Sequence, residues 1–201
     1  MRRVFLAAME CEAECVRPHM NETDVLIVCG IGKVNAAAAA QRAISEFGAE
    51  LIVNAGLAGG FGSDMSVGDV YEVASAVEYD FDLARLNGTS VGVLDEYDSA
   101  YLDAETVGVF PSAVLATGDH FNDSEEDYSL IRDELGAGLR DMEGAAIAHV
   151  CKKNGVRFRA VKCITNVAGK GSMTGQYENA KAECLSVLTD ALGRYLRNPA
   201  F

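Results

Sequence analysis

The chain has 201 residues, of which 49% are hydrophobic, and this is enough to bury the core of one domain spanning residues 1–201. Seventeen Lys and Arg against thirty Asp and Glu give a formal net charge of −13, which disfavours binding to a phosphate backbone or an anionic membrane surface. We therefore expect a small-molecule ligand, and neither nucleic acid nor membrane as a partner.

Apolar runs rich in Val, Ile and Leu alternate with helical patterns along the chain, which is typical of a largely parallel sheet covered by helices. The pattern predicts strands over residues 3–9, 24–30, 49–56, 67–80, 112–119 and 156–167. It predicts helices over residues 33–47, 124–135 and 177–196, the second with Ser124 as its N-cap. The predicted fold class is therefore α/β.

The N-terminal segment reaches Glu10 after only a few apolar residues, so it lacks the apolar centre of a signal peptide. No apolar run approaches the roughly eighteen residues of a membrane span. The six cysteines form no CxxC pair, and they are Cys11, Cys15, Cys29, Cys151, Cys163 and Cys184. We expect a cytoplasmic protein with reduced thiols, without a metal site and without a cofactor.

Two glycine clusters follow predicted strands, where glycine lets a backbone approach a ligand closely. "CGIGKVNAA" lacks the spacing of a Walker phosphate loop, and "GLAGGFG" does not fit the GxGxxG pattern of dinucleotide-binding proteins. Taken alone, each cluster favours a tight turn between a strand and a helix over a ligand loop.

Six motifs occur in order along the chain: "AMECE", "GIGKVNAA", "NAGLAGG", "VGDV", "TGDHF" and "DMEGAAIAHVC". Together they resemble the bacterial 5′-methylthioadenosine/S-adenosylhomocysteine nucleosidases, within the larger purine nucleoside phosphorylase family, and the resemblance covers nearly the whole chain. It implies a three-layer α/β sandwich with a central twisted mixed β-sheet flanked by helices. It also implies a homodimer that splits the N-glycosidic bond of a purine nucleoside.

Glu143 enters a segment that otherwise suits a core, and the resemblance places it at the ribose. A buried carboxylate can accept hydrogen bonds from two adjacent ribose hydroxyls, which offsets its desolvation when sugar binds. Beside it, Met142 would supply an apolar surface under the sugar, and Asp141 matches an acid found in many relatives. The alternative for Glu143 is a solvated acid, or one stabilised by the dipole of a helix N-terminus.

Glu12 in "AMECE" matches the glutamate that serves the nucleosidases as the general base for the attacking water. Hydrolysis through an oxocarbenium-like transition state needs such a base near the anomeric carbon, and help for the departing purine. Glu10 of the motif is kept, whereas Cys11 replaces its middle acid. The alternative for Glu12 is an acid on a solvated helix face after the first strand.

Phe121 in "TGDHFND" corresponds to an aromatic residue that stacks on the purine, and the backbone of Asn122 to the position that reads its Watson–Crick edge. The alternative for Phe121 is core packing. We assign no catalytic role to His120 or His149. The resemblance implies further substrate-binding positions at Met9, Ile31, Ala58, Gly59 and Tyr177.

The chain departs from the nucleosidases in a late strand, where they carry an "R-x-x-S-D" pattern whose aspartate protonates the purine. The matching stretch here is "KCITN", with Lys162 and Thr165 as substrate-binding candidates and Asn166 in place of the acid. An amide offers both a donor and an acceptor, which suits a 6-oxopurine, whose O6 accepts a hydrogen bond. Asn166 in this position resembles the phosphorylases for inosine and guanosine, and also the futalosine hydrolases, which release hypoxanthine.

Three functions remain open from the sequence. Leu57 replaces a serine of the family, and the chain is shorter than typical nucleosidases between Asn87 and Val109, where a helix is expected to be missing. Glu12 and the lack of arginine in the glycine loops favour water over phosphate as nucleophile. We expect a hydrolase, with a phosphate-dependent phosphorylase and an inactive nucleoside sensor as alternatives.

Overall fold

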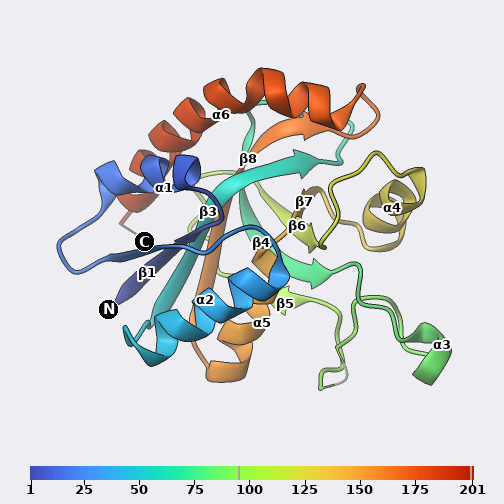
Figure 1. The fold of residues 1–201 in the computed structure, drawn as a ribbon, viewed down its shortest axis with the longest axis horizontal. Helices are drawn as coiled ribbons and strands as arrows, with labels where there is room; N and C mark the ends of the chain where they lie inside the picture. Colours follow the sequence, from blue (N-terminus) through green and yellow to red (C-terminus); the bar gives the residue numbers. More distant parts are fainter. Residues whose placement is uncertain (95, 200) are drawn as a thin grey trace.

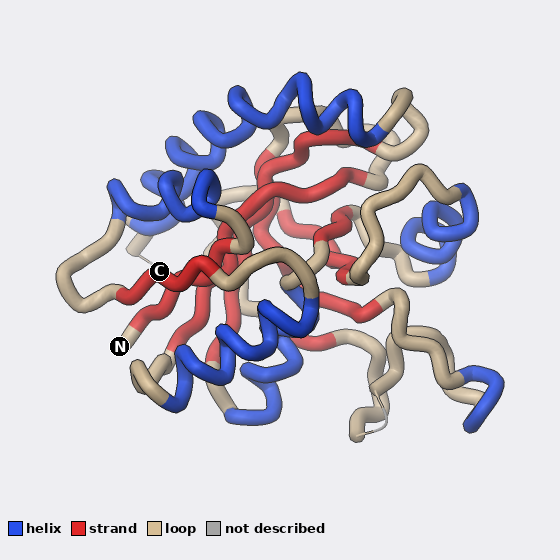
Figure 2. Tube along the Cα trace, in the orientation of Figure 1, coloured by secondary structure: helices blue, strands red, loops and turns tan. Residues whose placement is uncertain are grey.

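A mixed sheet forms the centre of the protein, as Figures 1 and 2 show. The structure is a computed structural model that describes residues 1–94, 96–199 and 201. Within these residues the sheet has eight strands: β1 Arg3–Ala7, β2 Val25–Val28, β3 Leu51–Gly60, β4 Val70–Glu78, β5 Leu102–Asp103, β6 Ser112–Thr117, β7 Leu139–Asp141 and β8 Arg157–Val167.

Part of this sheet closes on itself. Strand β3 pairs with both β7 and β8, β4 pairs with both β6 and β8, and β6 pairs with β7, so that these five strands form a ring. Strands β1 and β2 extend the sheet from β3 in parallel, and β5 lies antiparallel on β4. The mixed sheet expected from the family resemblance is confirmed, and the closed ring adds to it.

Helices cover the two faces of the sheet and give the predicted three layers. They are α1 Glu10–Val16 with a 3-10 turn Arg17–His19, α2 Lys33–Ser45, α3 Ala84–Asn87, α4 Glu125–Ser129 with a π-helical turn Leu130–Glu134, α5 Gly144–Asn154 and α6 Met173–Leu196. Figure 1 shows α1 and α6 on one side of the sheet and α2 and α5 on the other. One apolar cluster lies under each pair. No helix in the described residues is long and apolar enough to cross a bilayer.

Strands β3 and β8 lie side by side in the middle of the molecule. All ten residues of β3 are buried, as are all of β8 after Arg157, because helices cover both faces. Such burial explains the nearly continuous apolar runs in the sequence. The strand predicted over residues 49–56 ends in the glycine cluster as expected but extends further into it, since β3 runs to Gly60 and keeps pairing with β8.

Other boundaries differ from the predictions at element ends. The last helix begins at Met173 rather than at Tyr177, with the Ser172 side chain accepting a hydrogen bond from the Gly175 backbone N–H. The predicted N-cap at Ser124 is confirmed, because its hydroxyl accepts from the Asp127 backbone N–H. In the segment expected to be shortened, residues 88–94 and 96–101 contain no helix or strand.

Candidate active site

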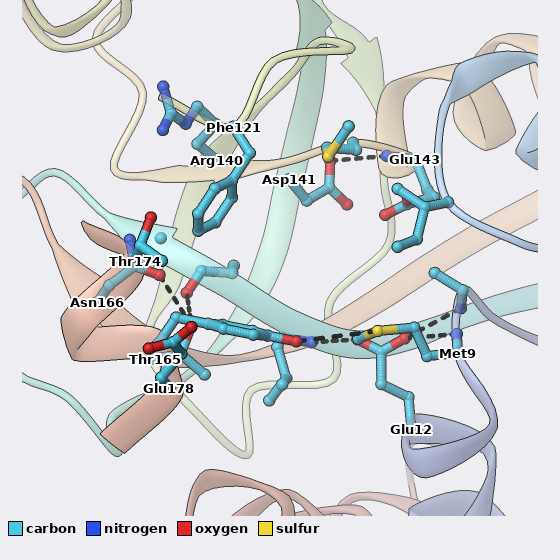
Figure 3. Close-up of a pocket in the computed structure, with 17 residues that line it drawn as sticks. Met9, Glu12, Phe121, Arg140, Asp141, Glu143, Thr165, Asn166, Thr174 and Glu178 are labelled. Atoms are coloured by element: carbon cyan, nitrogen blue, oxygen red, sulfur yellow. Dashed lines mark hydrogen bonds between the residues drawn. The ribbon is translucent and has the colours of Figure 1, made fainter. Parts of the chain in front are cut away.

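A cavity of about 520 Å³ opens at the carboxyl ends of β1, β3, β7 and β8, beside α6 (Figure 3). Its lining contains nearly all of the predicted site residues, namely Met9, Glu12, Ile31, Ala58, Gly59, Phe121, Asp141, Met142, Glu143, Thr165, Asn166 and Tyr177. Two predicted residues, Asn122 and Lys162, lie outside this lining. Figure 3 shows Glu12 and Glu143 toward one end of the cavity and Asn166 and Thr174 toward the other.

Glu12 lies in the first turn of α1, with its carboxylate turned inward. One oxygen accepts from the backbone N–H groups of Ala8 at 3.0 Å and Met9 at 3.1 Å, and the other accepts from Leu57 N–H at 2.8 Å. With 3% of its surface exposed, Glu12 is not the solvated acid that the sequence left open. Burial raises its pKa, while Lys162 and the three N–H groups oppose that shift.

The glycines of β3 make room for the polar groups of the site. A Cβ atom on Gly56 would lie 2.6 Å from a carboxylate oxygen of Glu12, and one on Gly59 would lie 2.9 Å from the Asn166 side-chain nitrogen. A side chain at either position would displace the functional group beside it. The glycine cluster therefore shapes the cavity wall.

Glu143 is buried at the start of α5 and points across the cavity toward the loop after β2. Its carboxylate accepts from the Gly32 backbone N–H at 2.9 Å. Burial, followed by repulsion from Asp141, raises the pKa of Glu143 from 4.5 to about 7. The carboxylate keeps lone pairs free, so it can accept hydrogen bonds from a ligand.

Asp141, and not Glu143, is the acid that binds the α5 N-terminus. Its carboxylate accepts from the Glu143 and Gly144 backbone N–H groups at 3.0–3.2 Å and from the Thr117 hydroxyl at 2.5 Å. It also forms an ion pair with Lys162, with Nζ and Oδ2 2.7 Å apart. These contacts leave Asp141 little capacity for a ligand, and they make it a support for Glu143.

Lys162 lies fully buried beneath the cavity. Desolvation lowers its pKa, but attraction to Asp141, Glu143 and Glu12 outweighs this effect and raises the pKa overall. Its predicted contact with substrate remains a prediction, since the ammonium group is bound to Asp141 and does not line the cavity.

Asn166 lies near the end of β8 beside Thr165. Its side-chain oxygen accepts from the Thr165 hydroxyl at 2.9 Å, and its nitrogen donates to the Met173 sulfur at 3.0 Å. A thioether is a weak acceptor, so this N–H can turn to a better partner in a ligand. Asn166 therefore brings a donor to its end of the cavity.

Phe121 and Tyr177 form an aromatic wall. Their rings meet edge to face, with centroids 5.9 Å apart. Phe121 is half exposed, so it is not packed in the core, which was the alternative for this residue. The Tyr177 hydroxyl lies 3.9 Å from the Met9 sulfur. A flat apolar ligand can stack on this wall.

Asn122, adjacent to Phe121, is bound by Arg140 through both of its oxygens. Its backbone oxygen accepts from Arg140 Nη2 at 2.8 Å, and its side-chain oxygen accepts from Nη1 at 3.2 Å. The role of its backbone in reading the base remains a prediction.

Sequence reasoning missed several lining residues: Ala8, Arg140, Thr174 and Glu178. It gave no contact to Leu57, whose buried backbone N–H donates to Glu12. Thr174 was missed because the last helix was expected to begin after it. Arg140 lies on β7, which is three residues long and carries no clear alternation. An arginine directly before "DME" in a buried stretch was the available signal.

The cavity combines four acids, Glu12, Asp141, Glu143 and Glu178, with an aromatic wall and an amide. Its basic neighbours are already engaged, Lys162 by Asp141 and Arg140 by Asn122. The described residues contain no cluster of His, Cys, Asp and Glu suited to a metal ion. The arrangement suits a ligand with hydroxyl donors at one end and a flat ring at the other.

Comparison with known proteins gives a consistent picture. Residues 16–197 match the family described as the phosphorylase superfamily. The 5′-methylthioadenosine/S-adenosylhomocysteine nucleosidase of Treponema pallidum (strain Nichols) is 34% identical over 181 residues, covering 72% of this chain and 67% of the relative. That of Marinomonas sp. (strain MWYL1) is 34% identical over 164 residues, covering 74% of this chain and 70% of the relative.

Solved structures share the fold. The S-adenosylhomocysteine nucleosidase of Streptococcus pyogenes, in complex with 5-methylthiotubericidin, aligns with a TM-score of 0.87 at 21% identity, over 99% of this chain and 97% of that one. A futalosine hydrolase mutant of Helicobacter pylori aligns with a TM-score of 0.78 at 20% identity, over 98% of this chain and 96% of that one.

Proposed function

The chain belongs to the phosphorylase superfamily, and from that premise we propose that it hydrolyses the N-glycosidic bond of a purine nucleoside. The observation that carries the proposal is the placement of two buried carboxylates, Glu12 and Glu143, in one cavity with Phe121 and Asn166. Its relatives named as 5′-methylthioadenosine/S-adenosylhomocysteine nucleosidases support this reaction class.

In the proposed reaction, Glu12 takes a proton from water as the water oxygen bonds to the anomeric carbon. The bond to the purine nitrogen breaks, its electron pair leaves with the purine, and the purine takes up a proton from solvent. The raised pKa of Glu12 makes it a better proton acceptor once it is ionised. Glu143 accepts hydrogen bonds from the ribose hydroxyls, for which it has free lone pairs. Phe121 stacks on the purine.

The charges beneath the cavity favour a cationic transition state. Three carboxylates, those of Glu12, Asp141 and Glu143, surround the single ammonium group of Lys162. When the acids are ionised, the group carries a net negative charge, which stabilises positive charge developing on the sugar. The same charge disfavours a phosphate dianion, so water is the better nucleophile and phosphorolysis the weaker alternative.

Asn166 bears on the identity of the base. Its amide N–H can leave the Met173 sulfur and donate to a purine O6, while its oxygen can accept from a purine N–H. We infer a preference for 6-oxopurine nucleosides, such as futalosine or inosine, over 6-aminopurine nucleosides. If so, Asn166→Asp reverses the preference, because the amide donor to O6 is lost and an acid is gained.

A chromatographic screen tests the function. Methylthioadenosine, adenosylhomocysteine, inosine and futalosine are incubated with the protein, with and without phosphate, and free base is measured. Release without phosphate supports hydrolysis, release only with phosphate indicates a phosphorylase, and binding without release indicates a sensor. Faster release of adenine than of hypoxanthine by the wild type, or an unchanged preference in Asn166→Asp, contradicts the proposed role of Asn166.

The setting of the reaction is part of the proposal. We expect residues 1–201 to act as one domain, in the cytoplasm, as a homodimer. The acidic composition and the many small helical residues support a soluble enzyme that shares apolar surface with a second copy.

A further inference from the structure

Arg140 is a buried cation on the short central strand β7. Only 4% of its surface is exposed, and its backbone pairs with Gly59 on one side and Ala116 on the other. Burying a guanidinium group is costly unless hydrogen bonds and an opposite charge offset its desolvation. A valine or leucine would fill this strand position without that cost, so the contacts of the guanidinium group indicate what it does.

The guanidinium contacts converge on the segment after β6. Arg140 donates to both oxygens of Asn122, and it lies 3.9 Å from the Asp127 carboxylate. Asp127 in turn accepts from the Asn122 side-chain nitrogen at 3.0 Å. The group also lies 5.4 Å from the centre of the Phe61 ring. Arg140 thus joins β7 to the start of α4 through Asn122.

The segment of residues 118–124, here called the aromatic loop, carries Phe121 into the cavity. Asp119 anchors one side of Phe121, because its carboxylate accepts from the Lys33 backbone N–H at 2.8 Å. Asp123 anchors the other side by accepting from the Met173 backbone N–H at 3.1 Å and from the Tyr128 hydroxyl at 2.9 Å. Arg140 holds the residue directly after Phe121.

We propose that Arg140 is a positioning residue for purine binding, whose guanidinium group holds the aromatic loop so that the Phe121 ring faces the cavity. In Figure 3 this group points away from the carboxylates at the other end of the cavity, which fits a role through the loop. The inference rests on the proposed function only in taking a purine as the ligand.

The test measures binding of free hypoxanthine and free adenine by calorimetry, so it does not depend on turnover. Arg140→Met removes the charge and the donors but keeps an unbranched chain, and Arg140→Lys keeps the charge without the paired donors. We expect Arg140→Met to weaken the binding of both bases about tenfold, which lies within the range that stacking on an aromatic side chain contributes. The affinity of Arg140→Lys should lie between those of Arg140→Met and the wild type. Arg159→Met is the control, since Arg159 is equally buried but bonded to Glu105 outside the cavity lining.

A double-mutant cycle separates positioning from a general loss of stability. If Arg140 acts through Phe121, then Arg140→Met and Phe121→Leu together weaken base binding no more than Phe121→Leu alone. Should Arg140→Met fail to fold, Asp127→Asn weakens the same anchor from its other side and is expected to reduce affinity for both bases.

Three outcomes would overturn the inference: unchanged base affinity in Arg140→Met, losses that multiply in the double variant, or a loss confined to one base, which would place Arg140 in direct contact with the purine. If the wild type binds neither base, the proposed function is at fault, and the role of Arg140 is then judged by whether Arg140→Met alters the Phe121 environment in NMR spectra. An unaltered environment would overturn it.

Discussion

Glu12 serves both the first helix and the proposed chemistry. Its carboxylate caps α1 through the Met9 backbone N–H and reaches across to Leu57 on β3. A glutamine at this position keeps an oxygen for one set of these donors and removes the basic group, although its amide nitrogen would face the remaining N–H and lower stability. The two roles can therefore be separated by a substitution of nearly equal shape.

Glu12→Gln is expected to lower the turnover number at least about 100-fold, because general-base catalysis contributes roughly 10²–10⁴-fold. Nucleoside binding should stay within a few-fold of the wild type, since a base acts in the transition state. Single-turnover kinetics and calorimetry measure the two effects. A variant that keeps more than about a tenth of the wild-type rate would remove Glu12 from the mechanism.

Glu143 is expected to lower stability above neutral pH. A carboxyl group whose pKa rises from 4.5 to about 7 on folding stabilises the protein fully below pH 4.5, and that contribution is lost as the pH rises through 7. Glu143→Gln does not ionise, so its melting temperature should exceed that of the wild type by several degrees at pH 8 and by little at pH 4.5. Melting curves at both pH values measure the difference.

The same variant tests the proposed contact with ribose. Glu143→Gln should weaken the binding of ribonucleosides at pH 8, where the wild-type carboxylate is ionised. It should hardly affect the binding of their 2′-deoxy analogues. Equal losses on both substrate classes would mean that Glu143 does not hold the pair of hydroxyls.

At the scale of elements, the sequence predicted the strands that carry strong apolar runs. It missed the strands that form only through pairing with neighbouring strands. Strands β3 and β8 were recognised because helices bury both their faces. Strand β7 is three residues long and two of them are charged, so its pairing with β3 and β6 had no local signal. The ion pair between Asp141 and Lys162 depends on that pairing. Motif resemblance therefore identified the side chains of the site, whereas the residues that pair with them could be identified only from the three-dimensional structure.

Glu72 on β4 holds a loop that the sequence left without structure. Its carboxylate is fully buried and accepts from four backbone N–H groups, those of Val107 at 2.5 Å, Gly108 at 3.3 Å, Val109 at 2.6 Å and Phe110 at 3.0 Å. These bonds pin the end of the segment expected to be shortened. One side chain thus supplies the hydrogen-bond acceptors for the loop's backbone N–H groups that helical carbonyls would otherwise supply.

Glu72→Gln is expected to destabilise the protein by about 2–4 kcal/mol, because the amide nitrogen would face backbone donors that need an acceptor. For a chain of this size each kcal/mol lowers the melting temperature by about 2–4 °C. Glu46→Gln is the matched control, since Glu46 is exposed and pairs with Arg42 on the surface of α2. Equal melting temperatures for the two variants would show that the loop does not depend on Glu72.

At the scale of the whole molecule, several large apolar side chains remain exposed. Ile31 lines the cavity with 52% of its surface exposed, and Val34 in the first turn of α2 is 81% exposed. Leu86 is also 81% exposed, on α3, which protrudes from the body in Figure 1. Exposed apolar surface of this kind is typical of a region that another protein covers.

We expect sedimentation at micromolar concentration to show a dimer, in which a second copy covers this surface. Burying Val34 and Leu86 against a partner removes apolar area from water, so the double variant Val34→Glu/Leu86→Glu should shift the equilibrium to monomer by introducing buried charge. Val67→Glu serves as the control, because Val67 is also exposed but lies in the loop between β3 and β4. A wild-type monomer would contradict the predicted dimer. A dimer that Val67→Glu disrupts as strongly as the double variant does would place the interface elsewhere. Nucleoside binding by the monomeric variant then shows whether one chain completes the cavity, since Ile31 would remain open to solvent.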